Sequence, residues 1–208
     1  VNPERQSWKC WDCNVGGDIF SFVEKQEGVE FREALRLLAD RAGIQLAAAR
    51  GATSNPQAAD EKEQLYRACA WAEQVFHDCL LKSPEAEPAR KYLAERSIDA
   101  QSISRFKLGY APDQWEWLVE KARGTQHQLT TLEKAGLIGK RQSGYGYYDR
   151  FKGRVLFSIR DVRGRAVGVG GRVLPGAPAD TAKYLNSPET PLFSKSQLLY
   201  GLDVAQQG

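Results

Sequence analysis

Residues 155–169 read VLFSIRDVRGRAVGV, and this stretch decides the fold class. Two apolar runs, residues 155–159 and 166–169, lie on either side of a turn at residues 161–164 that ends in a glycine. β-Branched and aromatic residues around such a turn are typical of an antiparallel hairpin. Ten of the nineteen glycines lie in residues 136–176, so this part of the chain is predicted to consist of strands and turns.

The sequence before this hairpin is predicted to be helical. Asp60 and Glu63 form a capping-box pattern at the start of a long helix that extends to about residue 82. Its apolar residues fall on one stripe and are expected in the core: Leu65, Ala68, Cys69, Ala72, Phe76, Cys79 and Leu80. His77 lies off this stripe and His127 lies among polar residues, so both are expected to be exposed. Because shorter helices are expected between residues 83 and 136, the predicted fold class is α+β, helices first and strands after.

The chain is predicted to contain two folded parts joined by a linker. Residues 1–45 begin with a short cysteine-bearing stretch and continue into two helices, the first capped by Asp18 and ended by Gly28. Residues 46–59 are small and polar with no periodicity, which is the composition of a linker. Residues 60–208 form the larger part. Because the chain starts with a valine and contains no methionine, it is expected to be a segment of a longer protein.

Composition and charge limit the classes of function. Apolar residues make up 42% and charged residues 26% of the chain, which is typical of a soluble folded protein. No apolar stretch is long enough to span a membrane and no signal peptide is visible, so a cytoplasmic protein without a membrane partner is expected. Residues 140–195 hold 11 Lys and Arg against 4 Asp and Glu, a net charge of +7. This concentration favours a surface for a polyanion, with a solvated basic face as the alternative.

Two cysteines near the N-terminus form the candidate metal site. Cys10 and Cys13 are separated by two residues, and this spacing on a tight turn lets two thiolates bind one tetrahedral ion, usually zinc. A redox-active dithiol and a pair of unligated cysteines are the alternatives. Four unevenly spread cysteines do not form a disulfide scaffold, which favours a reducing compartment. Because the other two cysteines are expected in the core, the remaining zinc ligands are expected before Val1.

Five stretches of the sequence, taken in order, carry a family resemblance. They are residues 8–22 (WKCWDCNVGGDIFSF), 104–112 (SRFKLGYAP), 148–161 (YDRFKGRVLFSIRD), 168–174 (GVGGRVL) and 183–193 (KYLNSPETPLF). The first resembles the second half of the zinc-ribbon domain of bacterial replicative (DnaG-type) DNA primases, in which an upstream Cys and His complete the zinc site. The other four resemble the RNA-polymerase domain of the same family. The resemblance implies an enzyme that makes short RNA primers on single-stranded DNA during replication.

The basic part of the chain is the candidate binding surface. Single strands are held by Lys and Arg along a groove, with aromatic faces on which bases stack. Residues 140–165 mix both kinds of side chain: Lys140, Arg141, Arg150, Lys152, Arg154, Arg160, Arg163 and Arg165 with Tyr145, Tyr147, Tyr148 and Phe151. The resemblance places five residues near template, ribonucleotide or RNA–DNA duplex: Arg105, Arg172, Lys183, Tyr184 and Lys195. The alternative for the lysines is that they only keep the surface soluble, and the alternative for the arginines is an ion pair with a neighbouring aspartate such as Asp149 or Asp161. A structural role of this kind, without a ligand, is favoured for Arg163 and Arg165 on the hairpin turn.

The resemblance also implies what the chain lacks. A Toprim subdomain, whose carboxylates hold the catalytic Mg²⁺ or Mn²⁺, is expected to follow residue 208, and the replicative helicase is expected to bind outside these residues. The 208 residues alone are therefore expected to bind template, ribonucleotides and RNA primer without polymerising. A non-catalytic accessory module that binds single-stranded DNA is the alternative function. The loop at residues 175–180 is longer than the family pattern, and the glycines of residues 168–171 are expected to allow close backbone approach in a strand.

Overall fold

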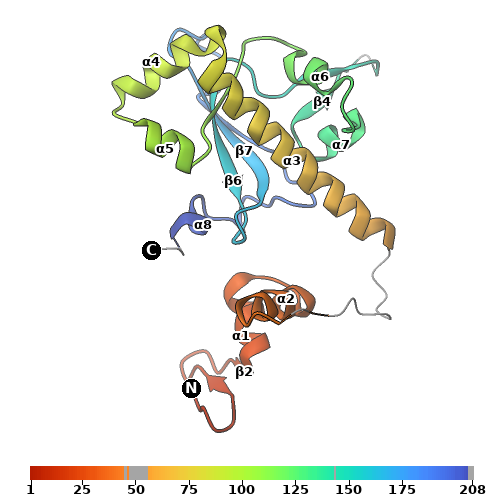
Figure 1. Cartoon of the computed structure of the whole chain (residues 1–208), viewed down its shortest axis with the longest axis vertical. Coiled ribbons are helices and arrows are strands. Elements are labelled where there is room, and N and C mark those ends of the chain that lie inside the picture. The colour runs from red at the N-terminus through yellow and green to blue at the C-terminus, as the bar shows by residue number, and fades with distance from the viewer. Residues whose placement is uncertain (45, 47–55, 143, 206–208) are drawn as a thin grey trace. The chain divides into compact units, whose positions relative to one another are not determined.

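The computed structural model describes residues 1–44, 46, 56–142 and 144–205. They divide into two compact units, Val1–Ser54 and Asn55–Gly208 (Figure 1). The first unit combines a small hairpin with two helices, and the second combines helices with an antiparallel sheet, so the α+β prediction is confirmed. Most of the stretch predicted to be a linker, residues 47–55, lies outside the described residues.

The N-terminal unit is built around a turn between two short strands. It contains β1 (Trp8–Lys9), β2 (Gly16–Gly17), α1 (Ile19–Glu27) and α2 (Phe31–Arg41). β1 and β2 pair antiparallel, and the turn between them carries both cysteines of the candidate zinc site. The carboxylate of Asp18 accepts the N–H of Ser21 (2.8 Å), and Gly28 ends α1 with a φ of 63°, as the sequence predicts.

The second unit begins with α3 (Pro56–Lys82). This helix was expected from Asp60 and begins four residues earlier, because proline is well suited to the first turn of a helix, where its missing N–H costs no hydrogen bond. Residues 56–59, assigned above to the linker, are therefore helical. The predicted apolar stripe is buried throughout, including both cysteines. Burial raises the pKa of the Cys69 thiol to about 12 and that of the Cys79 thiol to about 11.

Short helices and strands follow α3. In chain order they are η1 (Pro84–Ala86), α4 (Glu87–Glu95), α5 (Ala100–Arg105), β3 (Gly109–Ala111), α6 (Trp117–Ala122), α7 (Leu129–Lys134), β4 (Ile138–Lys140), β5 (Tyr147–Asp149), β6 (Arg154–Arg160), β7 (Ala166–Val173), β8 (Tyr184–Asn186) and α8 (Leu202–Ala205). The helices expected after Ser83, at 99–105 and near Trp117 and Leu132 are all present. No helix of the described residues has both the length and the apolar character needed to cross a membrane.

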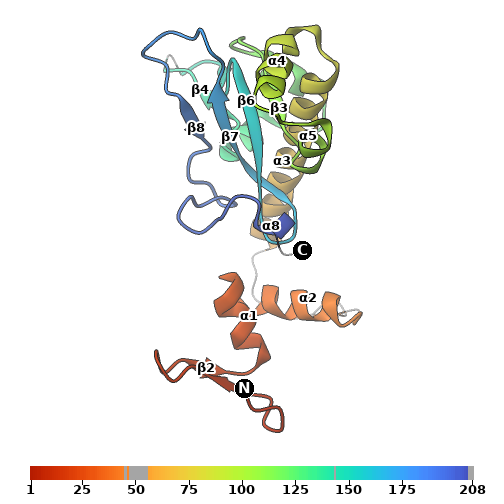
Figure 2. The same cartoon turned by 90° about the vertical axis from the view of Figure 1, so that its left-hand side faces the viewer.

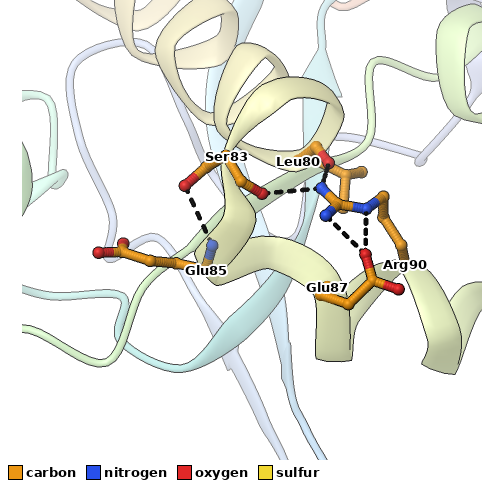
Figure 3. Close-up of polar contacts among 5 residues, drawn as sticks. All are labelled: Leu80, Ser83, Glu85, Glu87 and Arg90. Atoms are coloured by element: carbon orange, nitrogen blue, oxygen red, sulfur yellow. Dashed lines mark hydrogen bonds and ion pairs between the residues drawn. The ribbon is translucent and has the colours of Figure 1, made fainter.

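Arg90 fixes α4 to the end of α3 (Figure 3). Its Nη1 donates to the carbonyl oxygens of Leu80 (2.8 Å) and Ser83 (2.9 Å). Its Nη2 pairs with the carboxylate of Glu87 at 2.7 Å. The last carbonyls of a helix have no partner within the helix, so the arginine satisfies groups that α3 leaves unpaired and holds the next helix in place.

The central sheet has four antiparallel strands in the order β3-β6-β7-β8 (Figure 2). β6 and β7 are the predicted hairpin, extended at both ends. Figure 1 shows α3 lying across this sheet, with α4 and α5 to one side of the helix and α6 and α7 to the other. Ser158 and Arg160 contact Glu73 on α3, so the alternate residues Phe157 and Ile159 lie on the opposite face of the sheet.

His77 is buried, so the prediction of an exposed side chain was wrong. It is 4% exposed, and its Nδ1 donates to the carbonyl oxygen of Leu108 (2.7 Å). β3 packs closely on α3 at this point: a Cβ added to Gly109 would lie 2.7 Å from the Cβ of Phe76. The strand covers a second side of the helix, which the single apolar stripe does not reveal. His127 is also partly buried, against Trp71, and burial lowers its pKa.

Candidate nucleic-acid interface

An arginine and a tyrosine lie side by side on the sheet face opposite α3. Arg172 on β7 and Tyr184 on β8 are paired in register, and Arg172 Nη1 donates to the hydroxyl of Tyr184. The guanidinium carbon lies 5.0 Å from the ring centroid of Tyr184 and 5.7 Å from that of Tyr92 on α4. On the Tyr92 ring, the guanidinium of Arg96 is 4.8 Å from the centroid. Two arginines and two aromatic rings therefore form one continuous patch.

A hollow of about 390 Å³ lies on this same face. Its lining is mostly apolar and aromatic, with one cation: Phe157, Ile159, Gly170, Gly171, Tyr184, Asn186, Phe193, Lys195, Leu198 and Tyr200. Burial raises the pKa of Tyr200 to about 12. A Cβ added to Gly171 would lie 3.1 Å from side-chain atoms of Leu156, so this glycine makes room for neighbouring side chains rather than for another backbone segment.

The predicted cations fall into two groups by their ion pairs. Five are paired: Lys140 with Glu133 (3.3 Å), Arg141 with Glu116, Lys152 with Asp113 (3.9 Å), Arg160 with Glu73 (2.9 Å), and Arg165 with Asp161 (2.6 Å). Four form no ion pair within the described part of the chain: Arg105, Arg172, Lys183 and Lys195. Arg105, Lys183 and Lys195 are exposed, and Arg172 is half-buried. The second group keeps its charge available to a ligand, whereas a paired cation must first leave its carboxylate.

Two residues of the predicted surface lie inside the protein instead. Arg154 is 5% exposed, and its Nη2 donates to the carbonyl oxygen of Ala182 at 2.8 Å. Burial lowers the pKa of its guanidinium. Phe151 is 1% exposed and packs beside Gly171, so its ring is not available for base stacking. Both positions follow from the fold: backbone carbonyls of the β7–β8 connection surround Arg154, and a glycine on β7 leaves room for Phe151.

A second cavity, of about 480 Å³, lies beyond the end of β7. It is lined by three cations and one acid, with the loop of residues 175–180 as part of its wall: Tyr110, Asp113, Arg150, Lys152, Gly153, Arg154, Val173, Leu174, Pro175, Gly176, Ala177, Pro178 and Thr181. Lys152 lies 3.9 Å from the exposed carboxylate of Asp113. The buried Nε of Arg150 has no hydrogen-bond partner among the described residues. This cavity therefore suits an anionic group.

Asp149 binds backbone N–H groups instead of forming the ion pair with an arginine that the sequence allowed. Its carboxylate accepts the N–H groups of Leu118 (2.6 Å) and Val119 (3.1 Å) at the start of α6. Burial is the main reason that its pKa is raised to about 6, and the nearby carboxylates of Glu116 and Glu120 add to the effect. The ion pair that the sequence allowed between Asp161 and an arginine of the hairpin turn is present, at Arg165.

The turn of the N-terminal unit presents two thiols. The N–H of Cys10 donates to the carbonyl oxygen of Val15 (2.7 Å), which closes the turn, and both Cys10 and Cys13 are free. A hydrogen bond from the backbone of Cys13 lowers the pKa of the Cys10 thiol, which favours the thiolate that zinc requires. In the described residues, no three His, Cys, Asp or Glu side chains gather in an arrangement that would hold a metal ion. The turn therefore fits two of the four ligands of a zinc site.

Two family models match the chain. One, described as the DNA primase catalytic core, N-terminal domain, matches residues 76–206, and the other, the CHC2 zinc finger, matches residues 1–54. The chain belongs to the DnaG-type bacterial DNA primase family. The resemblance found in the five sequence stretches is thereby confirmed.

Individual primases show the same relationship. Those of Deinococcus radiodurans and Mycobacterium tuberculosis are 42% and 40% identical over the whole of this chain, which spans 34% and 32% of their lengths. A solved DnaG primase catalytic domain bound to single-stranded DNA is 40% identical with a TM-score of 0.65, over 72% of this chain and 45% of that one. The zinc-binding and RNA-polymerase domains of the Aquifex aeolicus primase align over 98% of this chain and 46% of that one, with 33% identity and a TM-score of 0.60. The chain thus spans about a third of the length of its curated primase relatives.

Four residues at the patch and the two cavities were not among the binding residues predicted from the sequence. Tyr92, Arg96, Trp115 and Asn186 are brought to these surfaces by packing. Arg96 meets the patch only because α4 places Tyr92 between it and Arg172, which is distant in the sequence. Trp115 did carry a signal: it follows Pro112 and Asp113 in a connection between two elements, where a large apolar side chain is not needed for a core.

Proposed function

We propose that this chain is the template-binding part of a DNA primase, an enzyme that makes short RNA primers on single-stranded DNA. Family membership supports the proposal, as do the relatives named DNA primase and the similar catalytic domain bound to single-stranded DNA. The observation that carries it is the β7–β8 group, formed by Arg172, Lys183, Tyr184 and Lys195. In this group three cations that form no ion pair among the described residues accompany an exposed aromatic ring, although the carboxylate of Glu189 lies near Lys195 and accepts its backbone N–H (3.0 Å).

The residues of the β7–β8 group would contact the phosphates and the bases of the ligand. Phosphates of the template, the ribonucleotide or the RNA primer pair with the three cations, and a base stacks on Tyr184. Arg105, Arg150 and Lys152 extend the cationic surface, whereas Lys140 and Arg141 contribute less because each already pairs with a glutamate. Arg154 supports the backbone rather than the ligand.

The proposed primase also requires metal ions and a helicase partner. Cys10 and Cys13 supply two ligands of a structural zinc ion, and ligands from outside the turn complete it. The catalytic Mg²⁺ or Mn²⁺ would be held by a Toprim subdomain outside these 208 residues, and the replicative helicase would bind a region that is also outside them. The protein would then work at the replication fork in the cytoplasm.

The test is a titration of labelled single-stranded DNA, followed by fluorescence anisotropy at several salt concentrations. Arg172→Ala, Lys183→Ala and Lys195→Ala should each weaken binding to all sequences and lower the log–log salt slope by up to roughly 0.7 per lost phosphate contact. The double variant Arg163→Ala/Arg165→Ala, on the hairpin turn, is the matched control. If this control loses more affinity than the three single variants, the binding surface has been assigned to the wrong part of the sheet.

A further inference from the structure

A buried ion-pair network joins the sheet to the C-terminal helix. Arg160, at the end of β6, pairs through its Nε with the carboxylate of Glu73 on α3 (2.9 Å), and its Nη1 lies 3.9 Å from the carboxylate of Asp203 on α8. The side chains of Glu73 and Asp203 are 14% and 8% exposed. Ser158, on the same face of β6 as Arg160, donates its hydroxyl to Glu73. One guanidinium therefore holds carboxylates of two helices in a place from which water is largely excluded.

The charges of this network stabilise one another. Burial lowers the pKa of the Arg160 guanidinium, but the hydrogen bond and charge of Glu73, with the charge of Asp203, outweigh this effect and raise the pKa overall. Asp203 also lies against the hairpin turn, since a Cβ added to Gly164 would be 4.0 Å from its carboxylate oxygen. Figures 1 and 2 show α8 at this end of the hairpin. Because separating a buried pair leaves each charge without its partner, the network opposes release of α8 from the sheet.

The residues just before α8 form one wall of the 390 Å³ hollow. This wall segment, residues 194–201, supplies Lys195, Leu198 and Tyr200 to the lining. At its start, the N–H of Lys195 donates to the carboxylate of Glu189 (3.0 Å). At its end, Asp203 follows Tyr200 by three residues. The ion-pair network therefore anchors the wall segment at the point where the chain leaves the hollow.

The wall segment itself buries little of its apolar surface. Leu199 and Tyr200 are 67% and 46% exposed. The ring of Tyr200 lies 6.3 Å from the rings of both Phe106 and Phe157, near the upper limit for an aromatic contact. A segment with few buried apolar contacts opens easily unless it is fixed elsewhere, so its position depends on the buried anchor at Asp203.

We propose that Glu73, Arg160 and Asp203 form a positioning network, which holds the wall segment in place and thereby sets the affinity of the hollow for single-stranded DNA without touching the ligand. The inference rests on the proposed template-binding function, because Lys195 belongs both to the wall segment and to the β7–β8 group. It adds to that function three residues outside the β7–β8 group.

The first measurement is hydrogen–deuterium exchange of all 208 residues, followed by mass spectrometry of peptides. Asp203→Asn removes the charge of the anchor and keeps the size of the side chain. Exchange of residues 194–205 should become severalfold faster, because this segment opens more often, while exchange of α4 should not change. The double variant Glu73→Gln/Arg160→Gln removes both charges of the other pair and should have the same effect on residues 194–205.

The second measurement is a fluorescence-anisotropy titration of labelled oligo(dT). Asp203→Asn should weaken binding by about threefold or more, because a wall segment that is in place for about a third of the time raises the apparent dissociation constant by that factor. The loss caused by Asp203→Asn should be smaller when Lys195→Ala is already present, because the network acts through the position of that lysine.

The matched control is Asp78→Asn, which breaks the exposed ion pair with Lys82 (3.0 Å) near the end of α3 and should change neither measurement. Unchanged exchange of residues 194–205 in both network variants would overturn the inference. Faster exchange with unchanged binding would also overturn it, and so would losses that add fully when Asp203→Asn is combined with Lys195→Ala. If the original chain does not bind oligo(dT), the proposed function itself fails, whereas binding that Lys195→Ala weakens and Asp203→Asn leaves intact refutes only the positioning network.

Discussion

The buried carboxyl of Asp149 predicts an unusual dependence of stability on pH. In the folded protein its pKa is raised from 3.8 to about 6, mainly by burial, with Glu116 and Glu120 adding repulsion. The folded state therefore binds a proton more tightly at this site than the unfolded state does. The contribution of Asp149 to the free energy of unfolding should fall as pH rises from about 4 to about 6, and should then stay constant.

The size of the effect follows from the two pKa values. A change from 3.8 to about 6 corresponds to about 3 kcal/mol between full protonation and full ionisation. About 2 kcal/mol of this loss of stability occurs between pH 4.5 and pH 7. The remainder occurs below pH 4.5, because the carboxyl of the unfolded chain is already mostly ionised at that pH. Most other perturbed carboxyl groups act in the opposite sense, since hydrogen bonds lower the pKa of Asp18, Asp78 and Asp99.

Asp149→Asn isolates the Asp149 contribution. An asparagine is neutral throughout, keeps one oxygen for the N–H groups of Leu118 and Val119, and loses the other as an acceptor. That loss lowers stability by an amount independent of pH. Denaturant unfolding of both proteins at half-unit steps from pH 4.5 to pH 7 gives the difference in free energy, in which the other carboxyl groups cancel. The original protein should lose about 2 kcal/mol relative to the variant across this range, and a constant difference would refute a raised pKa at this site.

Two further predictions concern metals. The 208 residues should hold zinc weakly, whereas a version extended upstream should keep one ion after a chelator wash, because two thiolates form half of a tetrahedral site. Elemental analysis checks this, and equal zinc content in both would show that Cys10 and Cys13 need no upstream ligands. The 208 residues should also make no primer on single-stranded DNA with Mg²⁺ or Mn²⁺ and four ribonucleotides, since the carboxylates that hold these ions in the family are expected on the Toprim subdomain. Labelled product above background would contradict this expectation.

Much of the fold was predictable because its signals are local. The Asp18 and Asp99 caps and the stripe of α3 each depend on residues within a few positions of one another, and the structure places them as expected. The hairpin of β6 and β7 was found in the same way, from two apolar runs around a glycine turn. The start of α3 was placed too late because linker composition outweighed the preference of Pro56 for the first turn of a helix.

Positions that depend on packing were not predictable in this way. His77 lies off the apolar stripe but is covered by β3, and Arg154 has the charge of a ligand-binding residue but its guanidinium is surrounded by backbone carbonyls. In both cases a distant segment decides whether the side chain is exposed. The family motifs identified the β7–β8 group, yet they gave no sign that Tyr92 and Arg96 adjoin it, because that contact depends on how Arg90 fixes α4 to α3.

The register of β7 places Arg172 beside the proposed stacking position, Tyr184. Side chains alternate between the faces of a strand, so Arg172 shares a face with Gly170 and with its partner Tyr184, and Val173 next to it lines the second cavity. A slip of one residue would turn Arg172 away from Tyr184 and bring Val173 to its place. The hydrogen bond from Val173 to Lys183 and the packing of Phe151 and Leu156 around Gly171 oppose such a slip. The packing at Gly171 therefore helps to hold the register that places Arg172 beside Tyr184.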